Sequence, residues 1–241
     1  YEIAQKIYTP AVHPREPYAT SRQLRVSPFY EREVALGGYF MEVAGWERAY
    51  GYAANEETLL AKYRDQVPTR EAEWDNRHFW EVSNAEHLAL SDGVGMINLS
   101  HFAIFDVEGA DAEGLMEYLS VAKVGADTAI GKGVYTHFLD HAGGIRSDLT
   151  IIRLAEDCFR VVCGGDTGHR DYIWMRDMSD RKGFANVTFH DRSEELATLG
   201  LWGPEARVTL AKLMDDPESI SNEAFPFATT KEITVSGVKV W

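Results

Sequence analysis

Apolar and polar residues alternate with a period of two along much of the second half of the chain. Such alternation, bounded by turn-forming residues, is typical of half-buried β-strands. It predicts a hairpin near the C-terminal end of the sequence and strands over 96–109, 132–140, 147–155, 158–164, 185–191 and 195–203. Short turns separate the three central strands, so we expect them to form an antiparallel meander.

Apolar residues at helical spacing predict helices between these strands. One helix is expected from Ser27, a suitable N-cap followed by proline, to a Gly-Gly pair. Another is expected from Ser83, where Glu86 completes a capping box, to Gly93. Further helices are predicted over 111–122, 166–183 and 204–216.

The remaining segments carry weaker patterns. Residues 1–26 hold three prolines and little periodicity, which predicts an extended arm or linker ahead of one domain over 27–241. Residues 45–57 are aromatic and irregular and are interpreted as a loop, and the polar stretch that follows to Asn76 is expected to be exposed. Helices interleaved with adjacent, tightly connected strands favour an α+β fold with antiparallel or mixed sheets over a parallel doubly wound fold.

Charge and composition argue against several classes of function. The 241 residues carry 24 Lys and Arg against 38 Asp and Glu, a formal charge of −14, which disfavours nucleic acid as a partner because phosphate binding needs a cationic face. No apolar run approaches the roughly 18 residues of a membrane span, and the first residues lack a signal-peptide pattern. Because the sequence begins with Tyr1 and not with Met, we expect it to be a piece of a longer protein.

Generic site motifs are weak. His137 and His141 are four residues apart, but the first falls in a predicted strand and the second in the following turn, so we expect no metal site. The stretch GGDTGHRD (164–171) lacks the residues of a phosphate loop and the spacing of a dinucleotide fingerprint, which favours a strand end followed by a helix cap. Cys158 and Cys163 are interpreted as ordinary thiols, which suits a reducing cytoplasm.

Four stretches, in order and in register, resemble a known family. They are GWERAYGY, VGMINLSHFAIFDVEGADA, KGVYTHFLDHAGGIRSDLTIIRL and LATLGLWGPEAR. Together they resemble the folate-binding module of the aminomethyltransferase (T-protein) of the glycine cleavage system, a module that dimethylglycine and sarcosine dehydrogenases also contain. The resemblance extends over residues 27–241 and ends before the family's later folate-binding segment. The chain therefore resembles the N-terminal part of such a module.

The resemblance implies one-carbon transfer to tetrahydrofolate. In the amine dehydrogenases, a flavin domain oxidises an N-methyl group, and the folate module lets N5 of tetrahydrofolate capture the resulting carbon as a methylene group. The module has to hold folate beside the electrophile and exclude water. The implied partners are tetrahydrofolate, a methylated small molecule and a flavoprotein domain or subunit that would hold any FAD.

Asn98 is the residue that the resemblance marks as catalytic and folate-binding. It stands where the family carries an aspartate, whose carboxylate can stabilise a cationic intermediate and assist proton removal. An amide can hydrogen-bond the pterin but cannot take a proton or offset a charge. The chain would then either move an intact methyl group from an oxygen, sulfur or nitrogen donor, or bind folate or support a flavin subunit as a non-catalytic scaffold. Asn98 as an ordinary turn or strand-edge residue is the structural alternative.

The resemblance marks further candidates for folate binding at Ser100, Tyr135, Asp148 and Arg153. Three of them have a structural alternative. Ser100 can cap or pair locally, and Asp148 can be a turn residue. Core packing is the preferred role for Tyr135.

Trp46, Glu47 and Arg48 lie in the first of the four stretches. We expect them to anchor their loop through aromatic burial and an ion pair. Their expected role is structural and involves no contact with a substrate.

Overall fold

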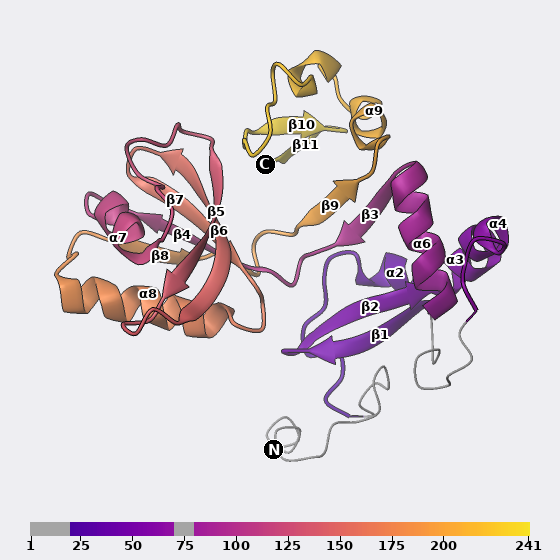
Figure 1. Cartoon of the computed structure of the whole chain (residues 1–241), viewed down its shortest axis with the longest axis horizontal. Coiled ribbons are helices and arrows are strands. Elements are labelled where there is room, and N and C mark those ends of the chain that lie inside the picture. The colour runs from indigo at the N-terminus through magenta and orange to yellow at the C-terminus, as the bar shows by residue number, and fades with distance from the viewer. Residues whose placement is uncertain (1–19, 70–79) are drawn as a thin grey trace. The chain divides into compact units, whose positions relative to one another are not determined.

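The computed structural model describes residues 20–69 and 80–241, which form two compact units (Figure 1). The first unit holds the described residues up to Leu99 together with Leu199–Ala206, and the second holds Ser100–Thr198 and Arg207–Trp241. Helices combine with antiparallel sheets in the described residues, which confirms the predicted α+β class. Most of the predicted arm and part of the stretch expected to be exposed lie outside the described residues.

The first unit begins with a short helix, α2 (Tyr30–Ala35). We expected this helix from Ser27, but Ser27 precedes it in a turn, where its hydroxyl accepts a hydrogen bond from the backbone N–H of Phe29 at 3.2 Å. The helix ends where predicted, because Gly37 adopts a left-handed φ of +70° that side chains disfavour.

A hairpin follows α2, formed by β1 (Gly38–Val43) and β2 (Trp46–Tyr52). The interpretation of residues 45–57 as a loop was therefore wrong. The two turn residues, Ala44 and Gly45, both have positive φ angles. This backbone matches the right-handed twist of paired strands and allows a two-residue connection.

A second helical region follows the hairpin in this unit. It runs through α3 (Ala53–Asn55), a π-helical turn (Glu56–Leu60) and α4 (Ala61–Tyr63), and it packs on α6 (Trp80–Asp92). Its apolar residues form a small core with those of α6, made of Leu60, Tyr63, Val67, Val82 and Ala85. We expected this stretch to be exposed, and that prediction was wrong for these buried residues. Helix α6 ends before Gly93 as predicted, but it already includes Trp80, so Ser83 is not its N-cap.

The strand predicted over 96–109 consists of two strands in different units. β3 (Gly95–Asn98) pairs with β9 (Leu199–Trp202) in the first unit, where Asn98 faces Leu199. β4 (Ala103–Glu108) belongs to the second unit. Unbroken alternation of residue types concealed the break, because alternation predicts strand conformation but not which strand is the partner.

The described part of the second unit contains a five-stranded antiparallel sheet with the order β5-β6-β7-β4-β8 (Figure 1). Its strands other than β4 are β5 (Gly133–Leu139), β6 (Ile145–Ala155), β7 (Cys158–Cys163) and β8 (Thr188–Asp191). Neighbours β5, β6 and β7 are consecutive in sequence, which confirms the predicted meander.

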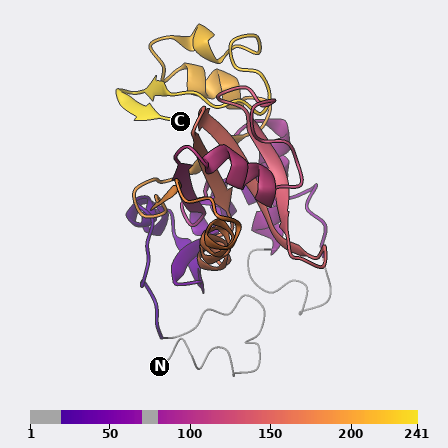
Figure 2. The same cartoon turned by 90° about the vertical axis from the view of Figure 1, so that its left-hand side faces the viewer.

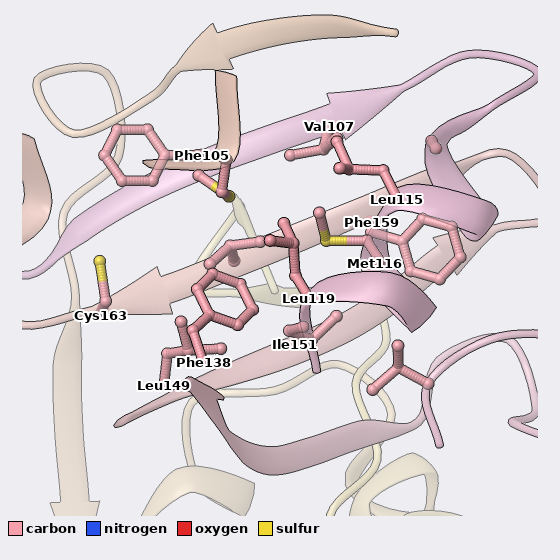
Figure 3. Packing of buried hydrophobic residues seen from close by; sticks show 14 of the residues in the cluster. Phe105, Val107, Leu115, Met116, Leu119, Phe138, Leu149, Ile151, Phe159 and Cys163 are labelled. Carbon is pink, nitrogen blue, oxygen red and sulfur yellow. The ribbon is translucent and has the colours of Figure 1, made fainter. Parts of the chain in front are cut away.

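Two helices, α7 (Ala112–Leu119) and α8 (Gly168–Lys182), cover one face of this sheet (Figure 2). Alternate strand residues point toward the helices and form the main core (Figure 3), which includes Phe105, Val107, Leu115, Met116, Phe138, Ile151, Phe159 and Met175. Burying each such side chain contributes about 1.5–3 kcal/mol to the free energy of folding. The chain then runs through α9 (Ala206–Ala211) and a 3₁₀ turn (Pro217–Ile220) to the predicted hairpin of β10 (Ile233–Val235) and β11 (Val238–Val240).

The opposite face of β4 carries a buried ion-pair network. Asp106 lies opposite Arg160 of β7 and accepts two hydrogen bonds from its guanidinium group, at 2.7 and 2.9 Å. Arg192 donates a third at 3.3 Å. Burial alone would raise the pKa of Asp106, but these bonds outweigh burial and hold the pKa below its ordinary value.

We predict that Asp106→Asn lowers the free energy of unfolding by about 3 kcal/mol at pH 7, because Arg160 loses its buried counter-charge. A carboxylate with a lowered folded pKa contributes stability that is fully present above its unfolded pKa of about 3.9 and lost as the pH falls through the folded pKa. The difference in free energy of unfolding between Asp106→Asn and the original chain should therefore become smaller below pH 4. Urea unfolding at pH 7 and pH 3 measures it, with the exposed Asp127→Asn as control. Equal midpoints of Asp106→Asn and the original chain at pH 7 would contradict the prediction.

Candidate functional site

Asn98 lies at the end of β3 with its amide held by two side chains of the same unit. Its nitrogen donates one hydrogen bond to the hydroxyl of Ser27 at 2.7 Å and one to Oε2 of Glu33 at 2.9 Å. Ser27 and Glu33 are both buried. The amide is therefore fixed by acceptors from the segment around α2.

Glu33 is the centre of this small network. The side chain is only 7% exposed, and its second oxygen accepts a hydrogen bond from the hydroxyl of Tyr52 at 2.8 Å. Burial, reinforced by that hydrogen bond, raises the pKa of Tyr52, so this residue remains a donor. The network thus links α2, β2 and β3 within the first unit.

Sequence reasoning missed Glu33 and Tyr52. The signal for Glu33 was present in its spacing, because it follows Phe29 and Tyr30 by four and three residues and so shares their face of the helix. Its neighbour Val34 is exposed, which reverses the ordinary placement of apolar and charged side chains. A charged residue at an inward-facing helical position is a recognisable sign of a polar network.

Ser100 belongs to the second unit and pairs with a residue far away in the sequence. It is 3% exposed, and its hydroxyl donates to the carbonyl oxygen of Thr198 at 3.4 Å and accepts from the N–H of Thr198 at 3.2 Å. These bonds are not the cap or local pairing considered for Ser100, because Thr198 lies 98 positions away in the sequence. Contact with folate stays a prediction for this residue.

Tyr135 and Asp148 lie together on the outward face of β5 and β6. Tyr135 is 63% exposed and donates its hydroxyl hydrogen to Asp148 at 3.2 Å, a bond that raises the pKa of the tyrosine. Core packing of Tyr135 was therefore the wrong expectation, because Thr136 and Phe138 take the inward positions of β5. Asp148 is a strand residue opposite His137 and not a turn residue.

Arg153 is not part of that outward pair. It is buried, five residues after Asp148 in β6, and an odd separation places it on the opposite face of the strand. Its guanidinium group donates to the carbonyl oxygens of Gly125 and Thr128 at 2.9 and 2.8 Å and to Glu113 at 3.0 Å. These bonds tie the loop around residues 125–128 to β6.

The expected anchoring role of the first family-like stretch is confirmed for two of its residues. Trp46 and Glu47 are buried. Glu47 forms an ion pair with Arg22 at 2.5 Å, and the guanidinium group of Arg25 lies over the ring of Trp46 at 4.9 Å. The partners come from residues that we had assigned to the arm, so residues 22–25 are attached to the β1–β2 hairpin.

The glycine-rich stretch before α8 has a structural explanation. β7 ends at Cys163 and α8 begins after Thr167, so a strand end and a helix start occupy this stretch, although the side chain of Thr167 makes no capping hydrogen bond. A Cβ atom at Gly165 would overlap the carbonyl oxygen of His101, so the backbone of the chain itself needs this glycine.

The described residues contain no group of three or more His, Cys, Asp or Glu side chains that could hold a metal ion. His137 lies in β5 and His141 follows it in the turn. Cys158 and Cys163 are free thiols, and burial raises the pKa of Cys163, which disfavours its reactive thiolate form. In the part of the chain that the structure covers, every helix is too short or too polar to cross a membrane.

Comparison with known proteins supports the resemblance seen in the sequence. The chain is 34% identical over 205 residues to 4-methylaminobutanoate oxidase (formaldehyde-forming) of Paenarthrobacter nicotinovorans, covering 85% of this chain and 23% of that protein. It is 27% identical to an aminomethyltransferase of Symbiobacterium thermophilum, covering 90% of this chain and 50% of that protein. It is 28% identical to mitochondrial sarcosine dehydrogenase of Mus musculus, covering 98% of this chain and 28% of that protein. The chain therefore spans half or less of the length of these curated relatives.

The fold has a counterpart among solved structures. The crystal structure of the glycine cleavage system aminomethyltransferase T from Bartonella henselae matches with a TM-score of 0.58 over 79% of this chain and 44% of that one. At 23% identity this likeness concerns the fold alone, and it confirms the expected T-protein-like architecture. The sequence model described as the GCVT N-terminal domain matches residues 29–241, nearly the whole chain. This chain therefore belongs to the GCVT N-terminal domain family.

Proposed function

We propose that this chain is a tetrahydrofolate-dependent one-carbon transfer module that captures a methylene or methyl group from an N-methylated amine. The names of three relatives refer to related chemistry: an aminomethyltransferase, a sarcosine dehydrogenase and an oxidase of 4-methylaminobutanoate that forms formaldehyde. Each of these names involves a single carbon attached to an amine nitrogen. The proposal gives this chain the role of receiving that carbon.

The observation that carries the proposal is the fixed orientation of Asn98. Its position is the one at which the family resemblance expects the catalytic residue, and its amide nitrogen is committed to two buried acceptors. An amide also carries a carbonyl oxygen with two lone pairs, and we propose that one of these lone pairs accepts a hydrogen bond from the ligand. Such an acceptor suits the N–H groups of a reduced pterin.

Tetrahydrofolate would supply the nitrogen nucleophile that receives the carbon. Asn98 would orient the pterin by accepting a hydrogen bond, and an ordered amide loses less entropy on binding than a mobile one. Tyr135 and Asp148, on the outward face of the second unit, remain separately proposed folate contacts. We keep Ser100 as a proposed contact and assign Arg153 a positioning role, since both terminal nitrogens of its guanidinium group donate to the protein.

The alternative chemistry is transfer of an intact methyl group from an oxygen, sulfur or nitrogen donor. The amide at position 98 favours it over reactions that need a base at that position, because an amide does not take a proton. A non-catalytic scaffold for a flavin subunit is the second alternative.

A flavoprotein domain or subunit is the proposed partner. The chain spans 23% of the 4-methylaminobutanoate oxidase and 28% of the sarcosine dehydrogenase. We therefore propose that another part of those proteins carries out the oxidation. Any FAD would accordingly belong to the partner. Two free cysteines suit a reducing compartment such as the cytoplasm.

Calorimetric titration of the purified chain with tetrahydrofolate tests the proposal. We expect binding with a dissociation constant below about 1 mM and a roughly tenfold weakening in Asn98→Ala, the effect of one lost hydrogen bond. The matched control is Asn84→Ala, because the amide of Asn84 donates to the carbonyl oxygen of Trp80 within its own helix.

Absence of heat from the original chain at millimolar tetrahydrofolate would end the proposal. Capture of a flavoprotein partner without folate binding would instead support the scaffold alternative. Equal affinity of Asn98→Ala and the original chain would remove Asn98 from the site.

Tyr135→Phe should weaken tetrahydrofolate binding by about fivefold with little effect on stability, because the lost hydroxyl is on an exposed face. Asp148→Asn should weaken tetrahydrofolate binding by a comparable factor. The loss of affinity in the double variant should be smaller than the product of the two single losses, since the residues share a hydrogen bond. Calorimetry measures the affinities. Tyr118→Phe, which alters another exposed tyrosine, is the control; unchanged affinity in both single variants would show that this face does not bind the ligand.

Arg153→Met should lower the free energy of unfolding by about 3 kcal/mol, because it removes buried hydrogen bonds and leaves two carbonyl oxygens without their donor. Urea unfolding measures this loss. Arg181→Met, at an exposed i,i+4 pair, should change stability by less than about 0.5 kcal/mol. An unchanged unfolding midpoint in Arg153→Met, together with lost folate affinity, would restore Arg153 to the ligand site.

A further inference from the structure

We infer that the N-terminal part of α8 and the turn between β5 and β6 form an anion-binding surface that docks an acidic segment of a partner polypeptide. The surface is made of His141, Arg146, Arg170 and Trp174, which all belong to the second unit. It includes none of the residues proposed to contact folate, so the inference does not depend on folate binding.

The first observation is a β-bulge at Arg146. The pairing of β5 with β6 shifts by one position here, so Arg146, which lies between Ile145 and Ser147, has no opposite residue. Regular alternation with the buried Ser147 would point Arg146 to the outward face of the sheet. The bulge gives it a different direction, because its guanidinium group lies 4.1 Å from the ring centroid of Trp174 in α8, a helix that covers the inward face.

A second guanidinium group lies next to Arg146. Nη2 of Arg170 donates a hydrogen bond to the carbonyl oxygen of Arg146 at 2.6 Å, and Nε of Arg170 lies 3.5 Å from Oδ1 of Asp171. The side chain of Arg170 is 51% exposed. The exposed His141 completes the cluster, because its ring centroid lies 5.7 Å from that of Trp174. Two guanidinium groups and two aromatic rings are therefore gathered at one place on the surface of the second unit.

The hydrogen-bond donors of this cluster are only partly used. In the part of the chain that the structure describes, no carboxylate forms an ion pair with Arg146, and the buried Nε of Arg146 and Nε1 of Trp174 have no hydrogen-bond acceptor. Guanidinium and indole N–H groups can only donate. A buried donor without an acceptor costs about 1–3 kcal/mol. The cluster therefore suits a ligand that brings both acceptors and negative charge.

The acidic neighbours of the cluster are engaged in other bonds. Asp171 is fully buried, and its Oδ2 accepts hydrogen bonds from two side-chain hydroxyl groups at 2.7 and 2.9 Å. Oδ1 of Asp140 accepts from two backbone N–H groups of the turn at 2.9 and 2.8 Å. Asp140 attracts Arg146 electrostatically but forms no ion pair with it. The guanidinium group of Arg146 thus keeps its charge and its terminal N–H groups for a partner.

The chemistry of the surface favours a polypeptide as the ligand. Exposed side chains of a helix and a turn do not enclose a small molecule, whereas a partner protein covers a surface of this kind. Trp and Arg are enriched among the residues that dominate the binding energy of protein interfaces. Nucleic acid needs a broad cationic face, but the chain has a formal charge of −14. Asp and Glu side chains fit best, because a carboxylate accepts two parallel hydrogen bonds from one guanidinium group.

Two-dimensional ¹⁵N–¹H NMR of the chain tests the inference. The probe is a synthetic peptide of alternating Glu and Ala residues, and the comparison peptide has Gln in place of Glu. The readout is the position of two resonances, the Nε–H of Arg146 and the indole N–H of Trp174, which Arg146→Gln and Trp174→Phe assign. We expect the acidic peptide to shift both resonances with a dissociation constant of about 0.1–1 mM at low salt and to bind several-fold more weakly at high salt. The Gln peptide should leave both resonances unchanged.

Substitutions at the two arginines separate a specific site from general attraction. Arg146→Gln and Arg170→Gln should each weaken binding of the acidic peptide about tenfold, the effect of losing a hydrogen bond to a charged group. Arg146→Lys should give an intermediate affinity, because lysine keeps the charge but lacks the planar fork that stacks on an indole. The matched control is Arg176→Gln, which removes the same charge from the same helix and also removes a guanidinium group stacked on a ring, that of Tyr172 at 5.7 Å. Its affinity should stay within about twofold of the original.

Unshifted resonances in the original chain at millimolar acidic peptide would overturn the inference, as would unchanged affinity in both Arg146→Gln and Arg170→Gln. Urea unfolding shows whether each variant folds, and if Arg146→Gln does not, Arg170→Gln at its half-exposed position decides. An equal loss of affinity in Arg176→Gln would indicate diffuse attraction and would also overturn the inference. So would a single-stranded oligonucleotide that shifts the same resonances at lower concentration than the peptide does, because the ligand would then be nucleic acid.

Discussion

A buried polar side chain needs hydrogen-bond partners within the protein. Without them, the free energy lost when the group leaves water exceeds the free energy gained from most apolar contacts. This constraint fixes several parts of the structure that apolar packing alone would leave loose. It attaches residues 22–25 to the hairpin through Glu47, and it ties a loop of the second unit to β6 through Arg153. It also holds Asn98 at the end of β3 in a single orientation.

The sequence allowed the meander of the second unit to be predicted because β-branched and aromatic residues alternate there and the turns are short. It did not allow the β1–β2 hairpin to be predicted, since the turn uses Ala44 and Gly45 in place of the more recognisable Asn-Gly pair. The break between β3 and β4 was missed for a different reason. Partner choice is a tertiary property, and the residue pattern is the same on either side of the break.

The candidate site was predictable only in part. Family resemblance led to Asn98, and strand periodicity could have separated Arg153 from Asp148, because five positions along a strand reverse the face. The contact between Asn98 and Glu33 could not be derived from spacing, since their segments are joined only by the fold. The exposure of Tyr135 depended on the register of β5, which placed Thr136 and Phe138 in the core.

The pairing of β3 with β9 has a consequence for biosynthesis. The two strands flank the long segment Ser100–Thr198, which contains every strand of the five-stranded sheet. During translation this sheet can therefore be complete before Leu199 emerges from the ribosome, whereas β3 must wait for its neighbour. Translation of the first unit thus begins before that of the second unit, but its folding is completed later. Until β9 is made, the edge of β3 stays unpaired and exposed.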